Sequence, residues 1–453
     1  MNSLRISLNA RKGFVCSAAM AMALVLLGGA NALANTVWQV SKSSSNATCT
    51  LSATTCNTIQ SAANAASPLD VILVGPGIYK ESVYIDTSNL TILGAQAGKD
   101  ARNRQPINES IVDATGQGSG PGYGAGFYVD VDNTVIDGFT IQGGTGGAYA
   151  TGVYSAYDDE GVYTEQYINN IIQNNAVGIY MYENYDGAVV KHNLIKNNNK
   201  GAKGSGEYDI PGPGFGVVLD ECWDGIAVTQ NAFSGNMAAA VFVDDSGEGV
   251  DVTQNTSNGD GALVVLYEAE DGVSISQNVG SNFGAKGFMP VTGTTNAGAA
   301  IELFYENYEI LISDNVLVGG KAAGYNGIDF SAKAFLDNSA DYVCEDCQIS
   351  NNQISQFTGD GIVAEASETG PTLDYSGITA NQVQQNGGVG ILIGASSENY
   401  YNTVLNNHME ENHTSDCEDE TIGSGSGTPA TADTWVNNVG WGRPVGLCNY
   451  TGE

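Results

Sequence analysis

Acidic residues follow alternating apolar residues at matching places in two neighbouring segments. In GVVLDECWDGIAVTQNAF, residues 216–233, the acid is Asp220, and in AVFVDDSGEGVDVTQNTS, residues 240–257, the acids are Asp244 and Asp245. Two carboxylates at strand spacing repel each other unless a cation lies between them or one of them stays protonated. Because both arrangements are typical of active sites, Asp220, Asp244 and Asp245 are candidate catalytic residues, and Asp220 and Asp244 are candidate calcium ligands.

A simpler interpretation of these acids is a solvated turn face on an acidic protein. Glu183, Asp186, Glu268 and Asp271 are acids in other turns of the chain. The sequence leaves both interpretations open.

A repeating unit has to position the acids. Each unit contains a small residue, an apolar strand, a polar turn, a second short strand, an Asn and a third strand, and the shortest units are 23 or 24 residues long. Such units cannot bury their own apolar faces, so they must stack into a parallel solenoid, in which stacked Asn side chains can hydrogen-bond to one another. The recurrent Asn residues are Asn170, Asn193, Asn231, Asn255, Asn278, Asn315, Asn352, Asn381 and Asn407.

The repeats resemble the right-handed parallel β-helix superfamily, which includes pectate lyases, polygalacturonases and alginate epimerases. The segment TIQSAANAASPLDVILVGPGIYKESVYIDTSNLTILGA, residues 58–95, is similar to the N-terminal cap helix and first coil of that superfamily. The resemblance implies an all-β solenoid with about ten or more coils and a short N-terminal capping helix. We expect a cap segment over residues 35–67, the β-helix over 68–415 and a C-terminal tail over 416–453. No specific enzyme family is matched, because VVLYEAEDG stands where polygalacturonases carry Gly-His-Gly.

Alignment of the units on the Asn places two columns of outward-facing residues on the first strand. Three tyrosines follow one another in the first column, about 4.8 Å apart. Such a ladder is a flat platform for a sugar ring, although stacked tyrosines also stabilise a sheet without a ligand. The candidate substrate-binding residues in the two columns are Tyr128, Tyr154, Tyr180, Tyr182 and Tyr267.

A second candidate catalytic cluster lies further along the same columns and contains Glu302, Asp329, Lys333 and Glu365. The resemblance implies that a lysine beside calcium-binding carboxylates can act as a lyase base that removes a sugar C5 proton. Acidic neighbours alone make lysine a poor base, and a bound cation reverses this effect. A surface lysine paired with Asp337 or Glu365 is the simpler alternative.

The first 34 residues are typical of a secretory signal peptide. Arg5, Arg11 and Lys12 precede the apolar run GFVCSAAMAMALVLLGGA, and ALA at residues 32–34 forms a small-residue cleavage site. A retained membrane anchor is the alternative, but the apolar run is short for a spanning helix. We therefore expect a secreted protein, extracellular or periplasmic.

The cysteines support this expectation, because in an exported chain they indicate disulfides. We predict Cys49–Cys56 and Cys417–Cys448 as staples at the two ends and Cys344–Cys347 as a local bridge, although a CxxC spacing can also bind a metal. Cys222 is left without a partner.

The net charge of −34 argues against nucleic acid and anionic membranes as partners, and against an anionic glycan unless a cation intervenes. The sequence indicates a secreted protein that binds an extracellular polysaccharide along the outward face of the first strand and cleaves it, as a lyase or a glycoside hydrolase. The alternative is a non-catalytic cell-surface or adhesion protein that binds glycan and calcium.

Overall fold

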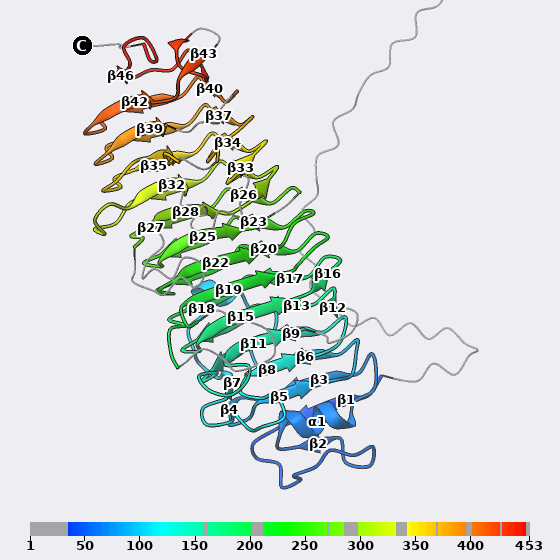
Figure 1. Ribbon diagram of the computed structural model, residues 1–453. Helices are drawn as coiled ribbons and strands as arrows, with labels where there is room; N and C mark the ends of the chain where they lie inside the picture. Colours follow the sequence, from blue (N-terminus) through cyan, green and yellow to red (C-terminus); the bar gives the residue numbers. More distant parts are fainter. Residues whose placement is uncertain are drawn as a thin grey trace, which may run out of the picture. The chain divides into compact units, whose positions relative to one another are not determined.

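Three long parallel sheets form the walls of a solenoid in the computed structural model of the protein (Figure 1). The structure describes residues 35–156, 162–201, 212–269, 271–284, 298–331, 342–367, 370–395, 401–425 and 428–449. The predicted signal peptide and Lys333 lie outside these residues. No helix in the described ranges is long and apolar enough to cross a membrane.

The 13-stranded sheet carries the candidate catalytic acids. Its strands, in chain order, are β5 (Val83–Ile85), β8 (Phe127–Val129), β11 (Thr151–Ser155), β15 (Val177–Tyr182), β19 (Phe215–Asp220), β22 (Ala239–Asp244), β25 (Ala262–Tyr267), β28 (Ala299–Phe304), β32 (Asn326–Phe330), β36 (Ile362–Ala364), β39 (Val389–Ile393), β42 (Ser415–Asp419) and β46 (Gly442–Arg443).

The 15-stranded sheet follows it in each coil. Its strands are β1 (Val37–Val40), β2 (Thr55–Cys56), β3 (Val71–Val74), β6 (Thr91–Leu93), β9 (Val135–Asp137), β13 (Gln166–Ile168), β17 (Val189–Lys191), β20 (Ala227–Thr229), β23 (Asp251–Thr253), β26 (Ser274–Ser276), β30 (Leu311–Ser313), β34 (Gln348–Ser350), β37 (Gly377–Thr379), β40 (Thr403–Leu405) and β45 (Thr434–Val436).

The 12-stranded sheet completes the coil. Its strands are β4 (Gly77–Tyr79), β7 (Ser110–Asp113), β10 (Phe139–Gln142), β14 (Ile171–Gln173), β18 (Leu194–Lys196), β21 (Ala232–Ser234), β24 (Thr256–Asn258), β27 (Val279–Ser281), β31 (Val316–Val318), β35 (Gln353–Ser355), β38 (Gln382–Gln384) and β41 (His408–Glu410).

Short pairs of strands lie outside the three long sheets. They are β12 (Val162–Tyr163) with β16 (Asn184–Tyr185), β29 (Asn307–Tyr308) with β33 (Cys344–Glu345), and β43 (Gly423–Gly425) with β44 (Thr428–Ala430). A 3-10 helix covers Ala101–Asn103. The long ladders extend beyond residues 68–415 at both ends, since β1 pairs with β3 and β42 pairs with β46.

The predicted capping helix is α1 (Ile59–Ala65). The Thr58 hydroxyl accepts a hydrogen bond from the Ser61 N–H, as an N-cap residue does. The Glu81 carboxylate accepts from the Ile59 and Gln60 N–H groups, which are also free at a helix start. The apolar side of α1 is buried at the N-terminal end of the solenoid, where it contacts β1, β2, β3 and β5.

The stacked asparagines hydrogen-bond along the solenoid as the sequence predicts. In one step of the ladder, Asn231 Nδ2 donates to Asn255 Oδ1 at 3.1 Å, and Asn255 Nδ2 donates to Asn278 Oδ1 at 3.1 Å. Each Oδ1 also accepts a backbone N–H from the preceding coil. The ladder therefore satisfies buried polar groups and fixes the register of successive coils.

A second ladder, which sequence reasoning missed, follows the third strand of several coils. Asn175, Asn198 and Asn236 bond in series, and Asn236 Nδ2 donates to Asp260 Oδ1 at 2.9 Å. Burial raises the pKa of Asp260 to about 7.

The disulfides Cys49–Cys56, Cys344–Cys347 and Cys417–Cys448 are all present, as predicted. Cys222 is a buried free thiol.

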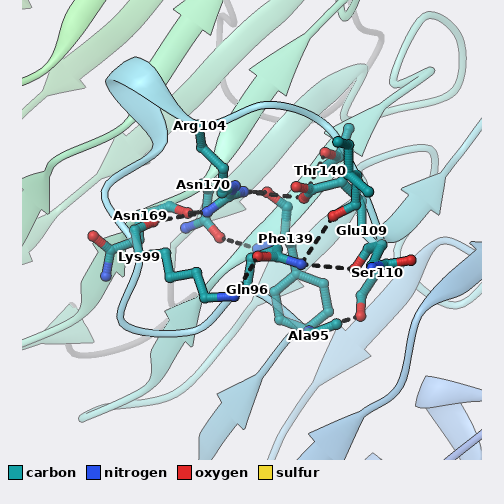
Figure 2. Close-up of polar contacts among 12 residues, drawn as sticks. Ala95, Gln96, Lys99, Arg104, Glu109, Ser110, Phe139, Thr140, Asn169 and Asn170 are labelled. Carbon is teal, nitrogen blue, oxygen red and sulfur yellow. Dashed lines mark hydrogen bonds and ion pairs between the residues drawn. The ribbon is translucent and has the colours of Figure 1, made fainter.

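A buried ion pair anchors the segment that precedes β7 (Figure 2). Arg104 Nη2 lies 3.0 Å from Glu109 Oε2, and the two side chains are only 6% and 2% exposed. Arg104 also donates to the carbonyl oxygens of Lys99, Asn169 and Phe139. One guanidinium therefore ties this segment to two other parts of the chain.

Candidate functional site

The register of the 13-stranded sheet places Asp220 and Asp244 side by side. Both are the last residues of their strands, β19 and β22, and they pair directly. Tyr182 pairs with Asp220 on one side, and Tyr267 pairs with Asp244 on the other. The order along the solenoid is therefore tyrosine, carboxyl, carboxyl, tyrosine, and all four side chains are partly exposed.

Asp220 accepts a hydrogen bond from the phenol of Tyr180. Tyr180 is fully buried, and its ring stacks on Tyr154 at 5.4 Å with an interplanar angle of 9°. Burial and the Asp220 charge raise the pKa of Tyr180 well above its usual value, so the phenol keeps its proton and donates it to this bond. A hydrogen bond to the charged form of a carboxyl stabilises that form, which favours an ionised Asp220.

Asp244, in contrast, favours its protonated form. Burial, followed by the charges of Asp220, Glu268 and Asp245, raises the pKa of Asp244 to about 8. Asp244 therefore carries a proton at neutral pH, and Asp220 beside it accepts the hydrogen bond from Tyr180. Two adjacent carboxyl groups with opposite protonation states can act as an acid and a base in one reaction.

A second row of acids occupies the turn directly after these strands. Each has a left-handed backbone conformation, with φ between 42° and 51°, and the members of the row are Glu183, Glu221, Asp245 and Glu268. Tyr182 Oη donates to Glu221 Oε2 at 3.4 Å, and burial together with Asp245 raises the pKa of Glu221. Asp245 thus belongs to this row and not to the column that contains Asp220.

The site residues predicted from the sequence do not include Glu183 and Glu221. The signal was available, because an acid directly follows the last strand residue in four successive units, as Tyr182-Glu183, Asp220-Glu221, Asp244-Asp245 and Tyr267-Glu268.

The tyrosine ladder has the predicted register, since Tyr128, Tyr154 and Tyr180 pair in order. The rings of Tyr154 and Tyr180 are fully buried, however, and Tyr149 packs on Tyr154 with its centroid 4.2 Å away. A sugar has no access to these faces without a rearrangement of the surrounding side chains. The ladder supports Tyr180, and the sugar contacts of the partly exposed Tyr182 and Tyr267 stay predictions.

The second candidate cluster is brought together in part. Glu302 and Asp329 pair in register on β28 and β32, and both are buried, with exposures of 0% and 1%. Asn326 Nδ2 donates to Asp329 Oδ2 at 2.9 Å. Glu365 lies in the other column, where it accepts from the Ser331 hydroxyl at 3.3 Å. Because substrate must reach a catalytic group, the partly exposed pair Asp220 and Asp244 is the better candidate.

Calcium binding at Asp220 and Asp244 stays a prediction. Within the described residues there is no group of three or more His, Cys, Asp or Glu side chains arranged to hold a metal ion. The pair supplies two carboxyl groups, fewer than the six to eight oxygen ligands that calcium takes, so water or substrate would have to complete the shell.

Residues 215–409, which include the whole acid pair, match the family model described as right handed beta helix region. The fold is a right-handed parallel β-helix. No curated protein matches the chain by sequence. The structure is similar to the catalytic unit of the GH87 alpha-1,3-glucanase from Streptomyces thermodiastaticus strain HF3-3, with 14% identity and a TM-score of 0.50 over 83% of this chain and 64% of that chain.

Other β-helix structures are similar at lower scores. DFA-IIIase from Arthrobacter chlorophenolicus A6 is 17% identical, with a TM-score of 0.46 over 77% of this chain and 87% of that chain. The A-module of the Azotobacter vinelandii mannuronan C-5 epimerase AlgE6 is 10% identical, with a TM-score of 0.47 over 81% of this chain and 90% of that chain. At these identities the activity of this protein has to be inferred from the site itself.

Proposed function

We propose that this protein is an exported β-helix enzyme that hydrolyses an uncharged extracellular polysaccharide at Asp220 and Asp244. The observation that carries the proposal is the pairing of a tyrosine-held carboxylate with a neighbour whose pKa is raised to about 8. Glycoside hydrolases use two such carboxyl groups, one protonated and one ionised. The GH87 alpha-1,3-glucanase that shares the fold is an example of a glycan-active enzyme built on a β-helix.

Asp244 acts as the general acid and protonates the leaving oxygen of the scissile glycosidic bond. Asp220 attacks the anomeric carbon, and Asp244 then takes a proton from the water that releases the sugar. Adjacent strands are about 4.8 Å apart. This spacing is near the separation of about 5–5.5 Å in retaining glycosidases and below the range of about 6.5–9.5 Å in inverting ones. The register therefore favours retention of configuration.

Three features support an uncharged substrate. The net charge of the chain is −34, the charged groups that act on Asp244 are all acids, and the turn beside the pair carries a further row of acids. An anionic glycan would be repelled by these groups. Hydrolysis of a neutral glycan is accordingly favoured over elimination from a uronate.

Export is supported by the three disulfides, which persist in oxidising compartments. The sequence of residues 1–34 has the pattern of a secretory signal peptide, which also supports export.

The pH dependence of kcat/KM tests the two assigned roles. Because the general acid must be protonated in the free enzyme, we expect activity to fall above about pH 8, where Asp244 loses its proton. Tyr180→Phe removes the donor to Asp220, and a hydrogen bond to a charged group contributes about 1.5–3 kcal/mol. Asp220 must be ionised to attack, so activity also falls at low pH. Loss of the Tyr180 hydrogen bond should shift this acidic limb of the profile upward by about one to two pH units.

Tyr154→Phe is the matched control for Tyr180→Phe, because Tyr154 lies in the same buried ladder on the preceding coil. Its acidic limb should stay within about 0.3 units of the wild-type limb. If both variants have the same pH profile as the wild type, Tyr180 does not influence the ionisation of Asp220.

Calcium is expected to raise the thermal midpoint of unfolding, and a chelator should reverse the gain. Binding to the native state stabilises it by about 1.4 kcal/mol when calcium is tenfold above its Kd. Differential scanning calorimetry across millimolar calcium, with magnesium as the control ion, measures this effect. If the midpoint does not respond to calcium, the repulsion between Asp220 and Asp244 is relieved by protonation and not by a bound ion.

A further inference from the structure

Two tyrosines on adjacent coils, Tyr375 and Tyr401, stack on each other at the surface. Their ring centroids are 5.1 Å apart with an interplanar angle of 18°. They are 51% and 68% exposed, in contrast to the buried ladder beside Asp220. The pair lies in the turn between the 13-stranded and 15-stranded sheets and takes no part in the site described above.

The backbone at both tyrosines is unusual. Tyr375 and Tyr401 have φ values of 46° and 63°, in the left-handed region that bulky residues rarely adopt. By strand register the equivalent positions of the two preceding coils are Glu309 and Asp346, so the column changes from acids to aromatic rings at Tyr375. Exposed rings at such positions gain little from burial, so stability alone is a poor reason for them.

The surroundings of the two tyrosines are acidic, and a strand bridge, a hydrogen bond and a disulfide hold them in place. Glu345 pairs with Asp374, and the Asp374 carboxylate accepts the Tyr375 N–H at 3.1 Å. The Cys344–Cys347 disulfide closes the turn that carries Glu345 and Asp346. Burial and Asp374 raise the pKa of Tyr375, so its phenol remains a hydrogen-bond donor. The surface thus offers a flat apolar face, a donor and several acceptors, which suits a sugar ring.

We propose that Tyr375 and Tyr401 form a second glycan-binding site, which holds an uncharged polysaccharide outside the active site. The identity of the ligand as the enzyme's own substrate rests on the proposed function. The acidic surroundings disfavour anionic glycans and nucleic acids. Because β36 lies four strands from β22, the platform is about 19 Å from Asp244 along the solenoid, so only a long chain can reach both sites.

The test replaces both tyrosines with Asn, written Tyr375→Asn/Tyr401→Asn, in the full-length protein. Asn adopts a left-handed backbone readily, so the double variant should fold as well as the parent, with an equal or higher thermal midpoint. Affinity electrophoresis and calorimetric titration measure Kd for soluble uncharged polysaccharides, namely α-glucan, β-glucan, mannan and fructan, and for alginate and galacturonan as anionic comparisons. All proteins carry Asp244→Asn, so that no cleavage consumes the ligand.

We expect the double variant to bind at least one of these glycans about tenfold more weakly than the parent. Tyr375→Phe/Tyr401→Phe keeps both rings and should bind within about threefold of the parent. Leu51→Ala, at a position 82% exposed and near the N-terminal cap, should not change Kd.

Three results would overturn the proposal: an unchanged Kd in the Asn double variant, binding restricted to anionic glycans such as alginate or galacturonan, and no binding to any glycan. Failure of the hydrolase proposal gives a different result. In that case reducing ends would be released by Asp244→Asn as fast as by the wild type, or by neither protein, and the ratio of Kd between the Asn double variant and its parent in affinity electrophoresis would still report on the tyrosine pair.

Discussion

Asp244→Asn and Asp220→Asn should each lower kcat/KM on a cleaved polysaccharide by about 10³-fold or more. An amide has the shape of the carboxyl group but cannot give or take the proton, and it cannot attack an anomeric carbon. General acid or base catalysis contributes about 10²–10⁴-fold, and loss of a covalent nucleophile adds to this. The initial rate of reducing-end release gives the measurement.

The same substitutions should leave the fold intact. Asp244 is partly buried among acids, so removal of its charge relieves repulsion and should hold the thermal midpoint constant or raise it. The amide oxygen that Asp220→Asn introduces can still accept the hydrogen bond from Tyr180. Loss of activity with retained stability separates a catalytic acid from a solvated turn.

Asp251→Asn is the matched control, because Asp251 is an exposed acid on the same coil as Asp244, in β23 of another sheet. It should change neither kcat/KM nor the thermal midpoint measurably. Full activity in both pair variants would show that Asp220 and Asp244 are surface acids without a catalytic role, and Glu302 and Asp329 would then be the candidate catalytic acids.

Arg104→Met is expected to reduce the free energy of unfolding by about 3–5 kcal/mol. The substitution leaves Glu109 buried without its counter-charge, and it removes donors from the carbonyl oxygens of Asn169 and Phe139. Both losses fall on groups that water does not reach, which is why the cost is large. Urea unfolding followed by circular dichroism provides the free energy.

Arg102→Met serves as the comparison on the same segment, since the Arg102–Asp100 ion pair is about one-third exposed on each side. An exposed ion pair contributes about 0–1 kcal/mol. The double variant Arg104→Met/Glu109→Gln should recover part of the loss by removing the buried charge. If the Arg102 and Arg104 variants lose the same small free energy of unfolding, the Arg104–Glu109 ion pair in Figure 2 contributes no more to stability than an exposed ion pair.

The register of the coils from Asn170 to Asn407 could be predicted from one residue type. Because the Asn side chain of each coil bonds to the next, the Asn spacing determines which residues of the first strand face each other, as Asp220 and Asp244 do. The same spacing placed Glu302 beside Asp329. Side-chain alternation then assigned two residues of each first strand to the outer face.

Burial of the outer face could not be predicted in the same way. Alternation shows that Tyr154 and Tyr180 point away from the core, but not that other side chains cover them. Nor does sequence spacing show that the Tyr180 phenol reaches the carboxyl at the end of the next strand, since this contact depends on two rotamers. Because of these contacts, the tyrosine ladder supports Asp220 and is not the exposed sugar platform that the sequence predicts.

Release of reducing ends from soluble uncharged polysaccharides tests the central claim most directly. The wild-type protein should generate reducing ends from at least one of α-glucan, β-glucan, mannan and fructan, and no unsaturated uronate should form on alginate or galacturonan. Unsaturated products would show a lyase instead of a hydrolase. Glycan binding without cleavage on the whole panel would contradict the account and favour the non-catalytic adhesion protein.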